Sequence, residues 1–160
     1  MAVRGAVTIE PVIKMTGMKR LIGLPVVLNG KQVGTVARGV VCPDGRKLRG
    51  LVVRSGLRSS RFLEAEDIRL LGRVSVLCTR KPARMPKEAA FRLFRVTDAS
   101  GARIGLVTDA VLDENTLRVT ALEISSGPVD DLLDGRWYAT VFHVTAAGNT
   151  GHVTVPCRQN

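Results

Sequence analysis

The sequence predicts an all-β protein built from two tandem small β-barrels, with at most short helical turns. Short runs rich in Val, Ile, Leu and Thr are separated by turn signals about every 8–12 residues, a spacing typical of all-β barrels and sandwiches. One arrangement of residues also occurs twice along the chain. Long stretches of helical periodicity are nearly absent.

The apolar runs are bounded by turn dipeptides such as Asn29-Gly30 and Ser100-Gly101. Several runs are apolar on both faces, as expected for strands that are covered on both sides. The segment from Glu64 to Leu71 could form a turn or two of helix. The expected strands span Val33 to Val41, Leu48 to Val53, Ile104 to Leu112, Leu117 to Ile124 and Tyr138 to Thr145.

The internal repeat has an offset of 71 residues, which aligns matching residues over 27 positions without a gap. Glycines recur at fixed places, and glycine is the residue that adopts positive φ or very close packing cheaply, so the two copies should share a backbone path. Beyond residue 127 the second copy is longer, and Phe62 is expected to match Trp137. The aligned pairs are Gly30–Gly101, Gly34–Gly105, Gly56–Gly127, Val33–Ile104, Val36–Val107, Leu51–Leu122, Val53–Ile124 and Ser55–Ser126.

The repeat predicts the organisation of the chain. Residues 1–17 form an N-terminal extension, in which Ala6 to Ile13 could add a strand. Residues 18–78 form the first barrel and residues 90–156 the second. Residues 79–89, with Pro82, Pro86 and several charges, are expected to be the linker.

The first copy contains motifs that are matched more weakly in the second. They are Met18 to Gly30, Val33-Gly34-Thr35-Val36, Asp44-Gly45, Gly50-Leu51-Val52-Val53, Phe62-Leu63, Glu66-Asp67-Ile68 and Leu71 to Leu77. This pattern resembles the PRC-barrel family. That family includes the cytoplasmic domain of the photosynthetic reaction-centre H subunit, the C-terminal domain of the ribosome-maturation protein RimM and small sporulation-associated proteins of the YlmC/YmxH type. The resemblance implies two small barrels that serve as adaptor or docking modules, with no catalytic residue set.

Charge is distributed unevenly within a net charge of +10. Residues 1–84 contain 17 Lys and Arg against 5 Asp and Glu, whereas residues 85–160 contain 7 against 9. Such a field attracts anionic partners, and the planar guanidinium of arginine bonds phosphate and carboxylate alike. The first copy is therefore expected to contact an anionic partner through Arg38, Arg46, Lys47, Arg49, Arg54, Arg58 and Arg61.

The composition leaves the class of partner open. Another protein is the expected partner, and docking the expected function. The alternative is an RNA- or ribosome-associated maturation factor that binds phosphates through the arginine-rich half. Phe62 is the one aromatic residue of that half, which disfavours base stacking. Lipid headgroups would also suit the charge.

Self-association is a further possibility, because a homodimer could form through an exposed strand edge. A basic half joined to an acidic half could also associate head to tail, within one chain or between chains. The two complementary segments are Asp130, Asp131 and Asp134 on one side and Arg54, Arg58 and Arg61 on the other.

An enzyme is not predicted, because no phosphate-binding loop or nucleophile motif occurs. His152 and Cys157 are expected in an exposed tail, and His143 as a hydrogen-bonded residue of a core or interface. No cofactor or metal is expected. The carboxylates Asp130, Asp131 and Asp134 should form a solvated loop, and Asp109, Asp113 and Glu114 a strand end and turn.

Three cysteines (Cys42, Cys78 and Cys157) form no C-x-x-C pair, and an odd number of this kind suits a reducing compartment. No run approaches the roughly 18 apolar residues of a membrane helix, and the first residues lack the apolar core of an export signal. A cytoplasmic protein without integral membrane contact is therefore expected.

Overall fold

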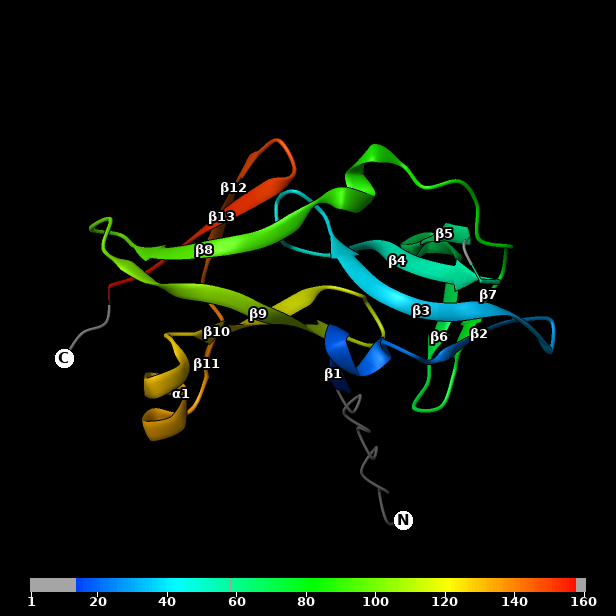
Figure 1. Ribbon diagram of the computed structural model, residues 1–160, viewed down its shortest axis with the longest axis horizontal. Helices are drawn as coiled ribbons and strands as arrows, with labels where there is room; N and C mark the ends of the chain where they lie inside the picture. Colours follow the sequence, from blue (N-terminus) through cyan, green and yellow to red (C-terminus); the bar gives the residue numbers. More distant parts are fainter. Residues whose placement is uncertain (1–13, 58, 158–160) are drawn as a thin grey trace, which may run out of the picture.

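The computed structural model describes residues 14–57 and 59–157. These residues form two β-sheets, and the all-β prediction is confirmed (Figure 1). The first sheet contains β2 (Pro25–Leu28), β3 (Lys31–Val41), β4 (Leu48–Ser55), β5 (Ser59–Glu64), β6 (Ile68–Leu71) and β7 (Val76–Cys78). The second contains β1 (Met15–Gly17), β8 (Arg92–Asp98), β9 (Arg103–Asp113), β10 (Val119–Ser125), β11 (Trp137–Ala139), β12 (His143–Ala147) and β13 (Thr150–Val155).

Short helical elements connect the strands. The 3-10 turns are η1 (Met18–Leu21), η2 (Ala65–Asp67) and η3 (Lys87–Ala90), and the α-helix is α1 (Pro128–Asp134). The helical turn expected between Glu64 and Leu71 is present only as η2, because the chain returns to an extended path in β6. Within the described residues, no helix has the length and apolar character needed to cross a membrane.

The two sheets share one strand order. The first reads β5-β4-β3-β2-β7-β6 and the second β11-β10-β9-β8-β13-β12, so each strand of the second follows its counterpart by six. In both sheets one neighbouring pair is parallel, β2 with β7 and β8 with β13. The prediction of closed barrels is not confirmed, because each hydrogen-bonded path among the described strands is open at its two ends.

The strand registers also repeat at an offset of 71 residues. Val36 pairs with Val53 on β3 and β4, and Val107 pairs with Ile124 on β9 and β10. All six register pairs and both bulges of the first hairpin recur in the second at this offset. The recurring glycine has a physical cause: a Cβ on Gly34 would lie 2.7 Å from the carbonyl oxygen of Arg54, and one on Gly105 would overlap that of Ser125.

The outer strands correct one of the expected matches. Val52 pairs with Phe62, and Glu123, which lies 71 residues after Val52, pairs with Tyr138. Phe62 therefore corresponds to Tyr138, and the expected match with Trp137 is wrong by one residue. The difference matters because a shift of one residue moves a side chain to the other face of a strand.

The halves join through equivalent residues. Lys47 and Arg118 form an antiparallel bridge. The Leu48 N–H donates to the carbonyl of Leu117, and the Val119 N–H donates to the carbonyl of Arg46, both over about 2.8–2.9 Å. Each residue of this contact faces the counterpart of its neighbour 71 positions away, so exchanging the halves leaves the contact unchanged. Such a self-complementary contact is typical of a two-fold dimer interface.

Each hydrophobic core also contains residues of both halves. Val41 and Leu112 occupy equivalent positions at the ends of β3 and β9. Leu112 packs in the core formed by Val36, Leu51 and other residues of the first half. Val41 packs in the core formed by Leu122 and other residues of the second half. The two halves therefore form a single packed unit.

The segments that precede each half cross to the other half. β1, at the end of the N-terminal extension, pairs with β9 of the second sheet. In the linker, the backbone of Ala83 pairs with Phe62 on the outer strand of the first sheet. The strand considered for Ala6 to Ile13 lies outside the described residues. The linker and the extension thus act as structural parts of the opposite half.

Candidate functional site

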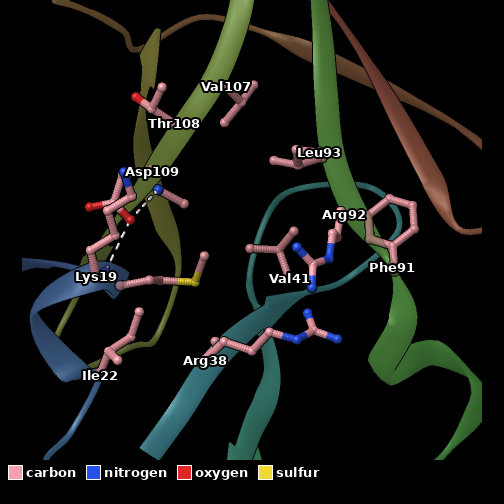
Figure 2. A pocket seen from close by; sticks show the side chains of 13 residues that line it. Lys19, Ile22, Arg38, Val41, Phe91, Arg92, Leu93, Val107, Thr108 and Asp109 are labelled. Carbon is pink, nitrogen blue, oxygen red and sulfur yellow. Dashed lines mark hydrogen bonds between the residues drawn. The ribbon is translucent and has the colours of Figure 1, made fainter. Parts of the chain in front are cut away.

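A groove of about 240 Å³ lies where the two halves meet, between η1, β3, β8 and β9 (Figure 2). Its surface is largely apolar, and charged side chains stand on its walls. Because strands of both halves supply the lining, the groove depends on how the halves dock. The lining residues are Met18, Lys19, Ile22, Arg38, Gly39, Val41, Phe91, Arg92, Leu93, Val107, Thr108, Asp109 and Ala110.

Two guanidiniums form the cationic wall. Arg38 projects from the middle of β3 and Arg92 from the start of β8, and Figure 2 shows them beside one another. Arg38 is half-buried and donates through Nη2 to the carbonyl of Ala89. Burial and the neighbouring Arg92 charge lower the pKa of Arg38 from its ordinary value. Among the described residues neither arginine forms an ion pair with a carboxylate, so this wall favours an anion.

Asp109 stands on the opposite wall, in the middle of β9. Its Oδ1 accepts the Lys19 N–H at 3.2 Å and the Ala110 N–H at 2.9 Å. Burial raises the pKa of Asp109, and these two hydrogen bonds oppose that rise without cancelling it. The prediction of a strand-end residue is therefore wrong for Asp109. Asp113 is a turn residue as expected, because its Oδ1 accepts the N–H groups of Asn115 and Thr116.

Arg38 and Asp109 are equivalent positions of the repeat, and both hold the segment that leads into the other copy. The Arg38 side chain donates to Ala89 in η3, whereas the Asp109 side chain accepts from Lys19 in η1. The same task is thus performed with opposite charges. This exchange leaves the groove with a cationic wall and an anionic wall.

The raised pKa of Asp109 leads to a test of stability. A carboxyl group with a raised folded-state pKa costs stability above that pKa, and the cost disappears as the pH falls below the ordinary Asp value of about 3.9. Asp109→Asn retains an oxygen acceptor for Lys19 and Ala110. We expect this variant to match or exceed the wild-type free energy of unfolding at pH 7, with the difference shrinking at acid pH, as measured by urea denaturation.

Asp98→Asn is the matched control with the opposite sign. A hydrogen bond from the Ser100 hydroxyl lowers the pKa of Asp98, so its contribution is present at neutral pH and is lost on acidification. This variant should be less stable than wild type at pH 7. A loss of stability at pH 7 for Asp109→Asn as large as that for Asp98→Asn would contradict the assignment for Asp109.

The other expected anion-binding residues do not gather at the groove. Arg46 and Lys47 are exposed at the bridge between the halves, where Arg118 joins them. Arg49 is bonded to Glu64, and its guanidinium lies 5.3 Å from the centre of the Phe62 ring. Arg49 is therefore occupied within the fold.

Arg54 and Arg61 are exposed on β4 and β5, and Arg61 lies beside Lys81 of the linker. Arg58 lies outside the described residues. The predicted set of seven therefore divides among three places, and Arg38 is the member that lines the groove. Sequence reasoning missed Arg92 and Lys19, although the opposite charges of Arg38 and Asp109 at one repeat position marked a place where the copies differ.

Several residues considered for chemistry lie elsewhere. His143 is exposed on β12, so the prediction of a core or interface residue is not supported within the described chain. His152 lies within β13 and not in a tail; its Nε2 is 2.9 Å from Oγ1 of Thr97. Cys157 is exposed beyond β13. No group of three or more His, Cys, Asp and Glu side chains in residues 14–57 and 59–157 is placed to hold a metal ion.

The acidic segment forms α1, and the expectation of a solvated loop is wrong. Pro128 occupies the first turn, where its missing N–H costs no hydrogen bond. Oδ2 of Asp131 accepts the Ser125 hydroxyl at 2.5 Å and Nε of Arg136 at 3.4 Å, which fixes the helix to β10. The hydrogen bond from Ser125 lowers the pKa of Asp131.

The chemistry available in the groove is that of binding. Its lining offers two guanidiniums, one amine, one carboxylate and one hydroxyl beside a larger apolar area. An anionic group set next to apolar side chains would satisfy both parts of this surface. No known family model matches this chain, and no curated protein matches it.

Proposed function

We propose that the protein is a non-catalytic adaptor of the PRC-barrel type that docks an acidic, partly apolar segment of another protein in the groove between its halves. The observation that carries the proposal is the pairing of Arg38 and Arg92 beside an apolar floor, without a carboxylate partner among the described residues. A nucleic-acid backbone offers phosphates but little apolar surface to fill such a floor. A protein segment that presents Asp or Glu beside Leu or Val offers both.

The tandem-barrel description belongs to the same proposal. It is supported by the shared strand order of the two sheets and by the parallel pairing of β2 with β7 and of β8 with β13, which brings the last part of each half against its first strand. The free thiols of Cys42, Cys78 and Cys157 support a cytoplasmic location, where thiols stay reduced.

One observation favours a second function, that of an RNA- or ribosome-associated maturation factor. Arg46, Lys47 and Arg118 are exposed around the bridge between the halves, and none of them forms an ion pair with another described residue. Three cations on an exposed surface suit phosphate contacts, which weaken steeply with salt.

Affinity capture separates these functions. Tagged wild-type protein, Arg92→Glu and the double variant Arg46→Glu/Arg118→Glu are each incubated with bacterial lysate, with and without nuclease and at low and high salt. The captured protein is identified, purified and titrated against each variant. Docking in the groove predicts capture that survives nuclease and a dissociation constant about tenfold higher for Arg92→Glu, since one charge-assisted hydrogen bond contributes roughly 1.5 kcal/mol or more.

The double variant is the control for groove docking, because its substitutions lie at the bridge and should leave that dissociation constant unchanged. Capture that requires intact RNA and is lost in Arg46→Glu/Arg118→Glu would replace groove docking with the RNA-associated function. Capture that is equal for wild type and Arg92→Glu would show that the groove is not the docking site.

A further inference from the structure

Helix α1 is an apolar element held away from the body of the protein (Figure 1). Val129, Leu132 and Leu133 are 68%, 86% and 75% exposed, and none of the seven helix residues, all of them described, is buried. The helix is nevertheless anchored, because Asp131 bonds to Ser125, Ser126 and Arg136. A fixed helix with exposed leucines is typical of an interaction surface.

The exposed side chains of α1 combine two chemistries. Val129 and Leu133 are four residues apart and share one side of the helix, with Leu132 next to them. Asp130 and Asp134 are also four residues apart and flank this apolar side. Both aspartates are exposed, and neither forms an ion pair with another described residue. The binding partner of α1 should therefore offer cations beside an apolar hollow.

The groove between the halves offers this combination, with Arg38 and Arg92 beside an apolar floor. Other surfaces of the chain fit α1 less well. The turn between β4 and β5 has exposed cations nearby and the exposed Leu57, but the hollow beside it is mainly polar. A second α1 would bring the aspartates of two helices together, and like charges repel.

We propose that α1 of one molecule docks in the groove of a second copy of this chain, with Asp130 and Asp134 toward Arg38 and Arg92 and the leucines over the apolar floor. The inference rests on the proposed function, since it names an occupant of the same groove. Contact within one chain is excluded, because α1 is anchored to β10 on the far side of the second sheet from β8, while the groove lies against β8 and β3. The head-to-tail pairing of Asp130, Asp131 and Asp134 with Arg54 and Arg61 is not part of this proposal.

The proposed contact joins two different surfaces. It either closes into a symmetric pair with two such contacts or continues from copy to copy. One short helix in one groove buries less area than a stable interface needs, so the association should be weak and reversible. It should also compete with any other protein segment that occupies the groove.

Sedimentation velocity on the full chain, from about 10 μM to 1 mM, tests the proposal with variants that disable opposite surfaces. Leu132→Asp/Leu133→Asp disables the helix, whose residues are outside both cores. Ile22→Asp/Arg92→Glu disables the groove, and both residues are exposed. Circular dichroism and thermal unfolding confirm that each variant folds.

The wild type should form a species larger than the 17.2 kDa chain as its concentration rises. Each variant alone should remain a monomer. A mixture of the two should form a two-chain species, because one variant retains the groove and the other the helix. The matched control, Arg54→Glu/Arg61→Glu, changes exposed cations outside the groove and should associate like wild type.

Three results would overturn the proposal. They are a wild type that stays monomeric throughout, a groove variant that still associates alone, and a control variant that becomes monomeric. The proposed function is judged separately. If Leu132→Asp/Leu133→Asp still captures a lysate protein in a manner that depends on Arg92, the adaptor function stands without self-docking. If capture ignores Arg92 while self-association requires it, the adaptor function fails alone.

Discussion

Leu112→Ala is expected to lower the free energy of unfolding by about 2–5 kcal/mol, the range for removing a fully buried leucine side chain from a core. Leu112 is fully buried, and although it belongs to β9 it packs in the core of the first half. The cavity would open between the halves. Both halves should therefore lose stability together, in a single unfolding transition.

Urea titration with two probes checks this expectation. Trp137, the single tryptophan, reports on the second half by fluorescence, and far-ultraviolet circular dichroism reports on both halves. The two curves should coincide for wild type and variant. Leu106→Ala is the matched control on the same strand, since Leu106 is 41% exposed and its truncation should change stability by less than about 0.5 kcal/mol. Separate transitions would show that the halves unfold independently.

Phe62→Ala is expected to cost about 3–5 kcal/mol, whereas Tyr138→Ala, at the equivalent position of the repeat, should cost about 0.5–1.5 kcal/mol. Phe62 is 2% exposed; its ring lies against Gly50 and under the Arg49 guanidinium. Tyr138 is 57% exposed, and its hydroxyl donates to Oε2 of Glu123 at 3.0 Å. The comparison isolates the effect of burial at one position of the fold.

A second measurement follows the linker, because the backbone of Ala83 pairs with Phe62. Loss of the Phe62 ring should loosen this contact and expose the basic residues Arg80, Lys81 and Arg84 to trypsin. Faster cleavage in the linker is therefore expected for Phe62→Ala and not for Tyr138→Ala. Equal losses of stability in the two variants would contradict the difference in burial.

The strands themselves could be predicted because their signals are local. Runs such as Val33 to Val41 and Ile104 to Leu112 lie within β3 and β9, and the paired glycines Gly34 and Gly105 mark the same close approach twice. The run from Tyr138 to Thr145 was less accurate. It divides into β11 and β12, because apolar content alone does not mark a break between strands.

The site could be predicted only in part. Arg38 was identified by the charge of the first half, but a charge count does not show which cations are already bonded within the fold, as Arg49 is to Glu64. Arg92 belongs to the half with net negative charge and became part of the site through docking of the halves. The helix at Pro128–Asp134 was missed because seven residues with exposed leucines have no buried face to set a helical period.

The sequence by itself determined the all-β class, the repeat and the excess of cations in the first half, because strand, turn and charge signals involve neighbouring residues. Only the tertiary structure decided that Leu112 completes the core of the other half, that the linker covers Phe62 while Tyr138 stays exposed, and that Arg38, Arg92 and Asp109 line one groove. These features arise where the two halves pack. Contacts between residues distant in sequence depend on the shapes of both surfaces, and no local pattern records them.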